Sequence, residues 1–185
     1  MTERIETPGL VLSTLRKNDI QKLLGFYERN IKFLEPWIPE YESGYYTYDY
    51  QIRKLEFEKK LREAGSEYRF NIFKKDDPER IIGNIAVSNI IRGIFQSAFI
   101  GYSVDEKENG KGIATEAIKG IIEFSFCDLM LHRLEANVIP SNKASIRVLE
   151  KLNFTEEGYS KNYLKINGKW QDHLRFALIN ENYFL

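Results

Sequence analysis

The sequence has very few of the residues that build metal centres or disulfide-stabilised folds. It contains one cysteine and two histidines, His132 and His173, which lie far apart in the chain. A single cysteine excludes an intramolecular disulfide, and Cys127 stands in an apolar helical pattern, so we expect a buried free thiol of the kind found in a reducing cytoplasm. Because nitrogen and sulfur ligands are so scarce, we expect no metal site.

The sequence also lacks a net charge and a long apolar run. Lys and Arg total 27, as do Asp and Glu, so no basic field indicates a nucleic acid partner. No apolar run approaches the roughly 20 residues that span a bilayer, and the opening MTERIETPG is no secretory signal. We therefore expect a cytoplasmic protein without a membrane or nucleic acid partner. A single domain over 1–185, as a monomer or homodimer, fits this length.

What is present predicts an α+β fold with a mixed, mostly antiparallel sheet. Alternating or β-branched stretches indicate strands, and stretches with a 3.6-residue period indicate helices, in the order β-α-α-β-β-β-α-β-α-β-β. The first strand is expected at 10–16. The helices are expected after Asn18 or Asp19, over 51–63, over 112–130 and in NKASIRVLEKLNF, with Asn153 in a left-handed conformation behind the last one. YESGYYTYDY is expected to be a surface loop.

The stretch VDEKENGKGIATEAIKG places Gly110 and Gly112 two residues apart where a strand is expected to pass into a helix. A plain turn with positive φ is one interpretation. A P-loop is disfavoured because Gly112, and not Ser or Thr, follows Lys111. A dinucleotide-binding turn, with Glu135 as the ribose acid, is disfavoured because Thr115 replaces the third glycine and an antiparallel meander precedes the turn.

What remains at this helix start is an anion-binding site built from main-chain donors. The N–H groups of Gly110 to Thr115 lie at the positive end of a helix dipole, and Lys107 and Lys111 add charge. Because glycine has no side chain, a diphosphate can reach the backbone there.

The segment ENGKGIATEAI after a strand, followed by HRLEANVIPSNKASIRVLEKLNFTEEGY, resembles the acetyl-CoA-binding half of the GNAT acyltransferases. RNIKFLEPWIPE, NIIRGIFQSAFIGYSV and YLKINGKWQDHLRFAL extend the resemblance to the ribosomal-protein-alanine N-acetyltransferases (RimJ/RimL) over nearly the whole chain. The resemblance implies the GNAT fold, in which two parallel strands of a mixed sheet splay and helices flank the sheet. It also implies acetyl-CoA as the acyl donor.

Carried onto this chain, the resemblance implies a place for each part of the cofactor. Gly101 to Val104 would offer backbone groups to the pantetheine and the thioester carbonyl, and Gly110 to Thr115 would hold the diphosphate. Asn142 would contact the cofactor, although a helix N-cap is its structural alternative. The implied cofactor residues are Gly101, Tyr102, Ser103, Val104, Lys107, Gly110, Lys111, Gly112, Ile113, Ala114, Thr115 and Asn142.

The catalytic groups are less clear. Ser145 is the expected donor to the leaving thiolate. RimL-type enzymes use a glutamate as base where this chain has Leu164, and other GNAT members use one where it has Asn137. Glu135 is the best remaining carboxylate, unless it pairs with Arg133 or a lysine. An α-amine, with a pKa of about 7.7–8.0, depends less on a base than a lysine at about 10.4, so a missing base favours N-terminal amines.

Other residues could line an acceptor groove or merely pack. Trp37, the tyrosine tract, Tyr163 and Trp170 are such aromatics, and Asp172 and His173 either orient an acceptor or close a hairpin.

We expect an acetyl-CoA-dependent N-acetyltransferase that acts on the N-terminal α-amine of a protein, such as a ribosomal protein starting with Ala or Ser. The alternatives are a polyamine or aminoglycoside acetyltransferase, which calls for an acidic pocket, and an acyl-CoA-binding sensor without catalysis.

Overall fold

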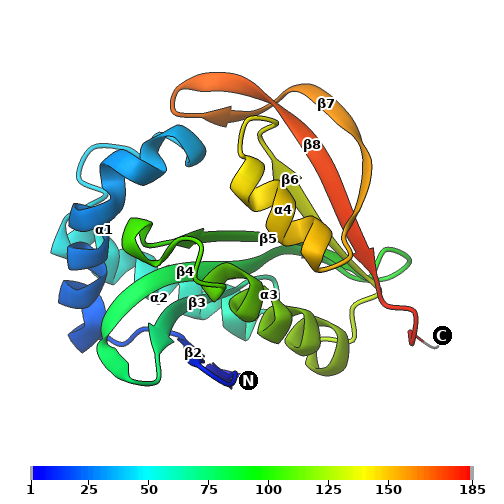
Figure 1. Ribbon diagram of the computed structural model, residues 1–185. Coiled ribbons are helices and arrows are strands. Elements are labelled where there is room, and N and C mark those ends of the chain that lie inside the picture. Colours follow the sequence, from blue (N-terminus) through cyan, green and yellow to red (C-terminus); the bar gives the residue numbers. More distant parts are fainter. Residues whose placement is uncertain (1, 184–185) are drawn as a thin grey trace.

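An eight-stranded sheet runs through the middle of the protein in the computed structural model, which describes residues 2–183 (Figure 1). The spatial order is β1-β2-β3-β4-β5-β6-β8-β7, and only β5 and β6 pair in parallel. The mixed, mostly antiparallel sheet is therefore confirmed. The strands are β1 (Arg4–Glu6), β2 (Leu10–Ser13), β3 (Tyr68–Lys74), β4 (Asp77–Ile91), β5 (Ser97–Val104), β6 (Arg133–Val138), β7 (Thr155–Ile166) and β8 (Lys169–Ile179).

Four α-helices cover the two faces of this sheet. They are α1 (Ile20–Leu34), α2 (Tyr48–Glu63), α3 (Ile113–Glu123) and α4 (Lys143–Lys151). Helix α1 packs on β4 and α2 on β3, whereas α3 packs on β2, β4 and β5 and also touches α4. In Figure 1, α3 and α4 lie in front of the sheet and α2 lies behind it.

Alternation along the strands supplies both faces with apolar side chains. In β2, Leu10 and Leu12 join the core under α3, while Val11 joins a smaller cluster with Phe26 of α1. Successive side chains of a strand point to opposite faces, so a sheet covered on both sides needs apolar residues at consecutive positions. The LVL of β2 meets that requirement.

Most predicted turns and caps are present. Asp19 stands at the N-cap position of α1, but its side chain accepts from the Arg16 N–H at 3.0 Å and makes no capping bond to this helix. Asn153 is left-handed with φ of 62°. Asn167 and Gly168 both have positive φ, which is the two-residue turn that closes the β7–β8 hairpin. Helix α2 begins at Tyr48, before the expected start, because the Thr47 side chain accepts a hydrogen bond from the Tyr50 N–H. The short strand β1 was not predicted.

The prediction of a buried cysteine was wrong: Cys127 is exposed. Helix α3 ends at Glu123 and continues as one π-helical turn over Phe124–Asp128, in which Leu129 N–H donates to the Phe124 carbonyl over 3.0 Å. A π turn contains an extra residue and so shifts the helical phase. Phe124 and Ser125 take the buried positions, and Cys127 turns outward.

The parallel strands β5 and β6 separate after three residue pairs. Ser97, Ala98 and Phe99 pair with Arg133, Leu134 and Glu135, and no pair follows although β5 continues to Val104 and β6 to Val138. The predicted splay is therefore confirmed, and it opens the sheet between its two halves.

Candidate active site

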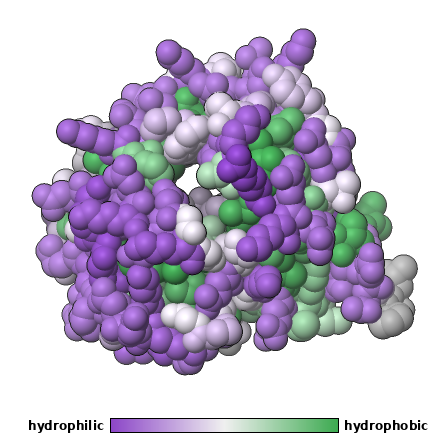
Figure 2. Space-filling model, in the orientation of Figure 1, coloured by the Kyte–Doolittle hydropathy of each residue, from purple (hydrophilic) through white to green (hydrophobic). Residues whose placement is uncertain are grey.

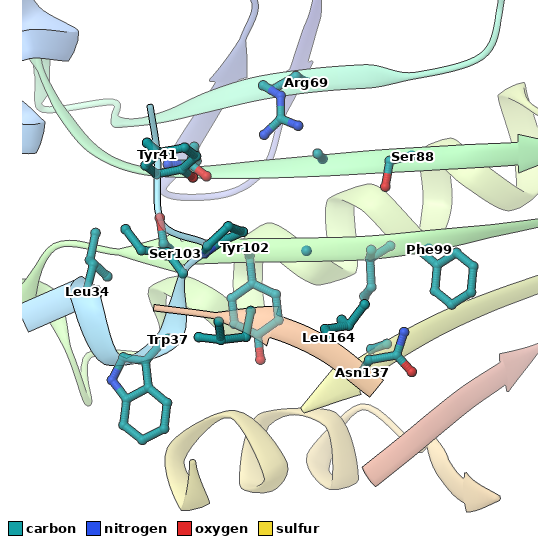
Figure 3. Close-up of a pocket in the computed structure, with 18 of the residues that line it drawn as sticks. Leu34, Trp37, Tyr41, Arg69, Ser88, Phe99, Tyr102, Ser103, Asn137 and Leu164 are labelled. Atoms are coloured by element: carbon teal, nitrogen blue, oxygen red, sulfur yellow. The ribbon is translucent and has the colours of Figure 1, made fainter. Parts of the chain in front are cut away.

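A cleft of about 520 Å³ extends along the splayed part of β5. Figure 2 shows the molecule hollowed between the region of α1 and that of α4. In Figure 3 the cleft runs from Leu34 and Trp37 at one end to Phe99 at the other. Of the residues predicted to bind the cofactor or to assist the leaving thiolate, those that line it are Gly101, Tyr102, Ser103, Asn142 and Ser145.

The splay leaves main-chain groups of β5 without a strand partner on the β6 side. Strand β5 is bonded to β4 up to the pair of Gly83 with Val104. In an antiparallel pair every second residue directs its N–H and C=O away from the partner strand. Beyond Phe99, those groups face the gap, and Gly101 leaves open space beside them. They are suitably placed to bind a peptide-like chain such as pantetheine.

The glycine loop has the geometry of an anion site. Gly110 and Gly112 have φ of 75° and 83°, and no atom lies within 4 Å of a Cβ added at either one. The first bond of α3 runs from Glu116 N–H to the Gly112 carbonyl, so the N–H groups of Ile113 to Thr115 have no acceptor within the helix. The Ile113 side chain is buried, and this residue therefore offers only its backbone. These groups fit a diphosphate.

A buried carboxylate holds the segment before this loop. Asp105 is 1% exposed. Its Oδ1 accepts from the Lys107 N–H at 3.0 Å, and its Oδ2 accepts from Asn30 at 3.2 Å and Arg80 at 3.0 Å. Burial raises the pKa of the Asp105 carboxyl, but donation from these groups outweighs burial and the pKa is lowered. Asn30 also accepts from the Glu106 N–H at 2.9 Å, so α1 is tied to the loop.

A second buried carboxylate, Glu108, anchors the loop to β3. Its Oε2 lies 2.7 Å from the Lys74 ammonium and 3.2 Å from that of Lys111. The hydrogen bond from Lys74 lowers the pKa of Glu108 in spite of its burial, and Lys111 adds to the effect. Lys111 thus belongs to the anchor of the loop, whereas the side chain of Lys107 is exposed.

Helix α4 presents Asn142 and Ser145 to the cleft. Asn142 Oδ1 accepts from the Ser145 N–H at 3.1 Å, so the N-cap interpretation of Asn142 is confirmed, and its contact with the cofactor stays a prediction. The Ser145 hydroxyl lies 2.7 Å from the Tyr102 hydroxyl. Figure 3 shows Tyr102 pointing from β5 toward α4. Burial raises the pKa of Tyr102 to about 12, further above neutral pH than the usual value for a tyrosine.

The positions expected for a base hold no free carboxylate. Asn137 and Leu164 both line the cleft and are labelled in Figure 3. Glu135 lies outside the cleft lining and accepts from Arg133 Nε at 3.1 Å, which is the ion pair given above as its alternative. Arg133 also pairs with Glu157. The role of Glu135 as a base stays a prediction, and its carboxylate is already paired with Arg133.

Part of the cleft wall is aromatic. Trp37, Tyr41, Tyr45 and Tyr163 contribute to its wall, whereas Trp170 is exposed and lies outside it. Tyr41 and Tyr45 stack with ring centroids 3.8 Å apart, and Tyr45 is buried. Tyr41 and Tyr45 of the tyrosine tract therefore belong to the cleft wall. The tract is a loop only as far as Thr47, because α2 begins at Tyr48.

Asp172 and His173 are neighbours on β8 but lie in different surroundings, Asp172 in the hairpin and His173 in the cleft wall. Asp172 accepts from the Tyr159 hydroxyl and, at 2.8 Å, from the Asn162 N–H, so it closes the hairpin. His173 is 2% exposed and lines the cleft.

Sequence patterns missed three participants, namely Asn30, Arg80 and the side chain of Tyr102. One signal was available. Asn30 stands four residues from both Phe26 and Leu34, on the apolar side of α1. A polar residue on such a face needs a buried partner.

Among residues 2–183, no helix is long and apolar enough to cross a membrane. The described side chains include no group of three or more His, Cys, Asp or Glu placed to hold a metal ion.

Comparisons with known proteins agree with this geometry. The model of the acetyltransferase (GNAT) domain family matches residues 10–155. A probable N-acetyltransferase of Bacillus subtilis, YjcK, is 42% identical over 167 residues, covering 90% of this chain and 91% of that protein. The [ribosomal protein uS5]-alanine N-acetyltransferase of Escherichia coli is 38% identical over 176 residues, covering 95% of this chain and 90% of the relative.

A solved structure is similar as well. Mycobacterium smegmatis RimJ, in complex with CoA-disulfide, superposes with a TM-score of 0.87 and 30% identity, covering 96% of this chain and 86% of that one. Enzymes of this family use acetyl-CoA, and the splayed strands and glycine loop fit that cofactor. The chain therefore belongs to the GNAT acetyltransferase family and is an acetyltransferase of the RimJ/RimL type.

Proposed function

We propose that this enzyme transfers the acetyl group of acetyl-CoA to the N-terminal α-amine of a protein, such as a ribosomal protein that begins with Ala or Ser. The relative from Escherichia coli is named for an alanine of ribosomal protein uS5. The same similarity to a bacterial ribosomal-protein enzyme favours a cytoplasmic location.

The observation that carries the proposal is the charge of the cleft. Glu58 is the sole carboxylate among the described residues that line it. It pairs with Lys54 and, at 3.1 Å, with Arg69, whose side chain points toward the cleft in Figure 3. A polycation such as a polyamine or an aminoglycoside needs free carboxylates, and a neutralised Glu58 offers none. A single amine at the end of a peptide makes no such demand.

The roles in this proposal follow the geometry. Main-chain groups of β5 from Gly101 to Val104 hold the pantetheine and polarise the thioester carbonyl. The N–H groups of Gly110 to Thr115 bind the diphosphate, with the charge of Lys107 nearby and Asn142 beside the pantetheine. Ser145 donates to the sulfur as the thiolate leaves.

The test is release of free thiol from acetyl-CoA in the presence of different acceptors. Peptides that begin with Ala or Ser are compared with the same peptides blocked at the N-terminus but carrying an internal lysine, and with polyamines and aminoglycosides. Thiol release with the unblocked peptides alone supports the proposal. Release with the polycations alone identifies a small-amine enzyme, and coenzyme A binding without turnover on any acceptor identifies a sensor.

A further inference from the structure

The cleft contains few groups that can accept a proton. Its described titratable residues are Tyr27, Tyr41, Tyr45, Lys54, Glu58, Arg69, Tyr102, Tyr163 and His173. Tyrosine, lysine and arginine side chains hold their protons at neutral pH. The Glu58 carboxylate forms salt bridges with Lys54 and Arg69. His173 is the side chain that remains.

The hydrogen bond of His173 fixes which of its ring nitrogens is free. Its Nδ1 lies 3.0 Å from the main-chain carbonyl oxygen of Gln171. A carbonyl oxygen can only accept, so Nδ1 carries the hydrogen, and Nε2 of the neutral ring carries a lone pair. Within the described chain, the only fully buried side-chain polar atom without a partner is the Ser125 hydroxyl. The unbonded Nε2 therefore keeps some exposed surface, although His173 as a whole is 2% exposed, and His173 lines the cleft.

His173 and Ser145 lie on opposite faces of the sheet. Leu174 and Phe176 of β8 pack into the core under α3 and α4, and Tyr102 of β5 reaches Ser145 of α4 on that same face. Because side chains alternate along a strand, His173 points to the other face, where α1 and α2 cover the sheet. The splay of β5 from β6 opens the sheet between these two faces.

From this placement we infer that His173 is the general base of the transfer, a role that rests on the proposed function. The amine nitrogen attacks the thioester carbon and forms the C–N bond, while the C–S bond breaks and the sulfur keeps its electron pair. One proton passes from the nitrogen to His173 Nε2 and on to solvent. The thiolate takes a proton from the Ser145 hydroxyl, which regains one from solvent. Amine and thioester thus become amide and thiol.

The decisive variant is His173→Asn. The asparagine amide can donate to the Gln171 carbonyl in place of Nδ1, but it has no second nitrogen that accepts a proton. We expect kcat/KM with an Ala-initiated peptide to fall about 100-fold or more, within the range for loss of a general base. Affinity for coenzyme A and the melting temperature should stay near those of the wild type. The matched control is His132→Gln, which changes the other histidine, placed outside the cleft lining, and should keep full activity.

A second measurement separates chemistry from structure. In His173→Ala, imidazole added to the buffer should restore part of the lost turnover, because it can occupy the vacated space and accept the proton. Retention of more than about a third of wild-type kcat/KM by His173→Asn would overturn the inference. So would a loss that imidazole does not restore, because His173 would then act through structure alone.

The wild-type enzyme in the same assay tests the proposed function independently. If it acetylates another class of amine, the proposed acceptor is wrong, while the ratio of His173→Asn to wild type on that amine still tests the base. If it acetylates no amine, the proposed function fails and the role of His173 fails with it.

Discussion

The hydroxyl oxygens of Tyr102 and Ser145 lie 2.7 Å apart and join β5 to α4 on the face of the sheet that α3 and α4 cover. The Tyr102 phenol is protonated at neutral pH, and burial raises its pKa further above the usual value, to about 12. It can therefore donate to Ser145 Oγ and leave the serine proton free for a further acceptor. We therefore expect Tyr102 to position the hydroxyl that we assign to the leaving sulfur.

Removing either hydroxyl should slow turnover more than it weakens cofactor binding. We expect Ser145→Ala to lower kcat about tenfold or more, equivalent to about 1.4 kcal/mol in the barrier, with KM for acetyl-CoA within about threefold. Tyr102→Phe keeps the ring and should cause a smaller loss. Because the two act as a unit, the double variant should be no slower than Ser145→Ala. Steady-state kinetics decides, and unchanged turnover in Ser145→Ala removes this residue from the chemistry.

The glycine loop can be tested by separating backbone strain from charge. Gly112 has φ of 83°, so any side chain there is strained, although space for a Cβ is open. Gly112→Ala measures the strain, about 1 kcal/mol. Gly112→Asp adds a carboxylate where we place the diphosphate, and we expect at least about tenfold weaker coenzyme A binding than in the alanine variant, measured by calorimetry. Equal affinities of the two variants would contradict the phosphate assignment.

Sequence patterns located the local features of this site well. The helix start behind Gly112, the cap at Asn142 and the left-handed Asn153 are each set by a few neighbouring residues, and all are present. The splay was implied by resemblance to a family, and the three-residue pairing of β5 with β6 confirms it.

The contacts that sequence patterns could not supply join residues far apart in the chain. Tyr102 and Ser145 are 43 positions apart, and Asn30 and Asp105 are 75 apart. Such pairs depend on how two layers pack, which no local period records. The prediction that Cys127 is buried failed for a related reason. The π turn adds one residue to the helix, and this changes the face on which the following side chains lie.

Asn30 connects α1 to the segment before the cofactor loop, and its loss should be felt in both stability and binding. The buried side chain donates to Asp105 and to the Phe26 carbonyl and accepts from the Glu106 N–H. Asn30→Ala leaves the part-buried Glu106 N–H without its acceptor and the buried Asp105 carboxylate with one donor fewer. We expect a loss of about 2–3 kcal/mol in the free energy of unfolding, measured in urea, together with weaker coenzyme A binding.

The exposed Asn18 provides the control, since Asn18→Ala should stay within about 0.5 kcal/mol of wild type. If Asn30→Ala is as stable as the control, Asn30 does not hold the loop. If stability falls but coenzyme A binds as before, the contacts of Asn30 with Asp105 and Glu106 do not affect the cofactor site.

The two buried acids make stability depend on pH in a direction that can be predicted. The pKa values of Asp105 and Glu108 are lowered in the folded protein, so their ionised forms are the ones that stabilise it. This contribution is complete above the unfolded-state pKa values, about 3.9 for Asp and 4.3 for Glu, and is lost as the pH falls through the lowered folded-state values.

Glu108→Gln removes one of the two groups. It should be less stable than wild type at pH 7, because Lys74 and Lys111 lose their partner, yet lose less stability on acidification. Urea unfolding across the acidic range measures this, with the exposed Glu123→Gln as control, and parallel curves for Glu108→Gln and wild type would show that Glu108 is not held as a carboxylate.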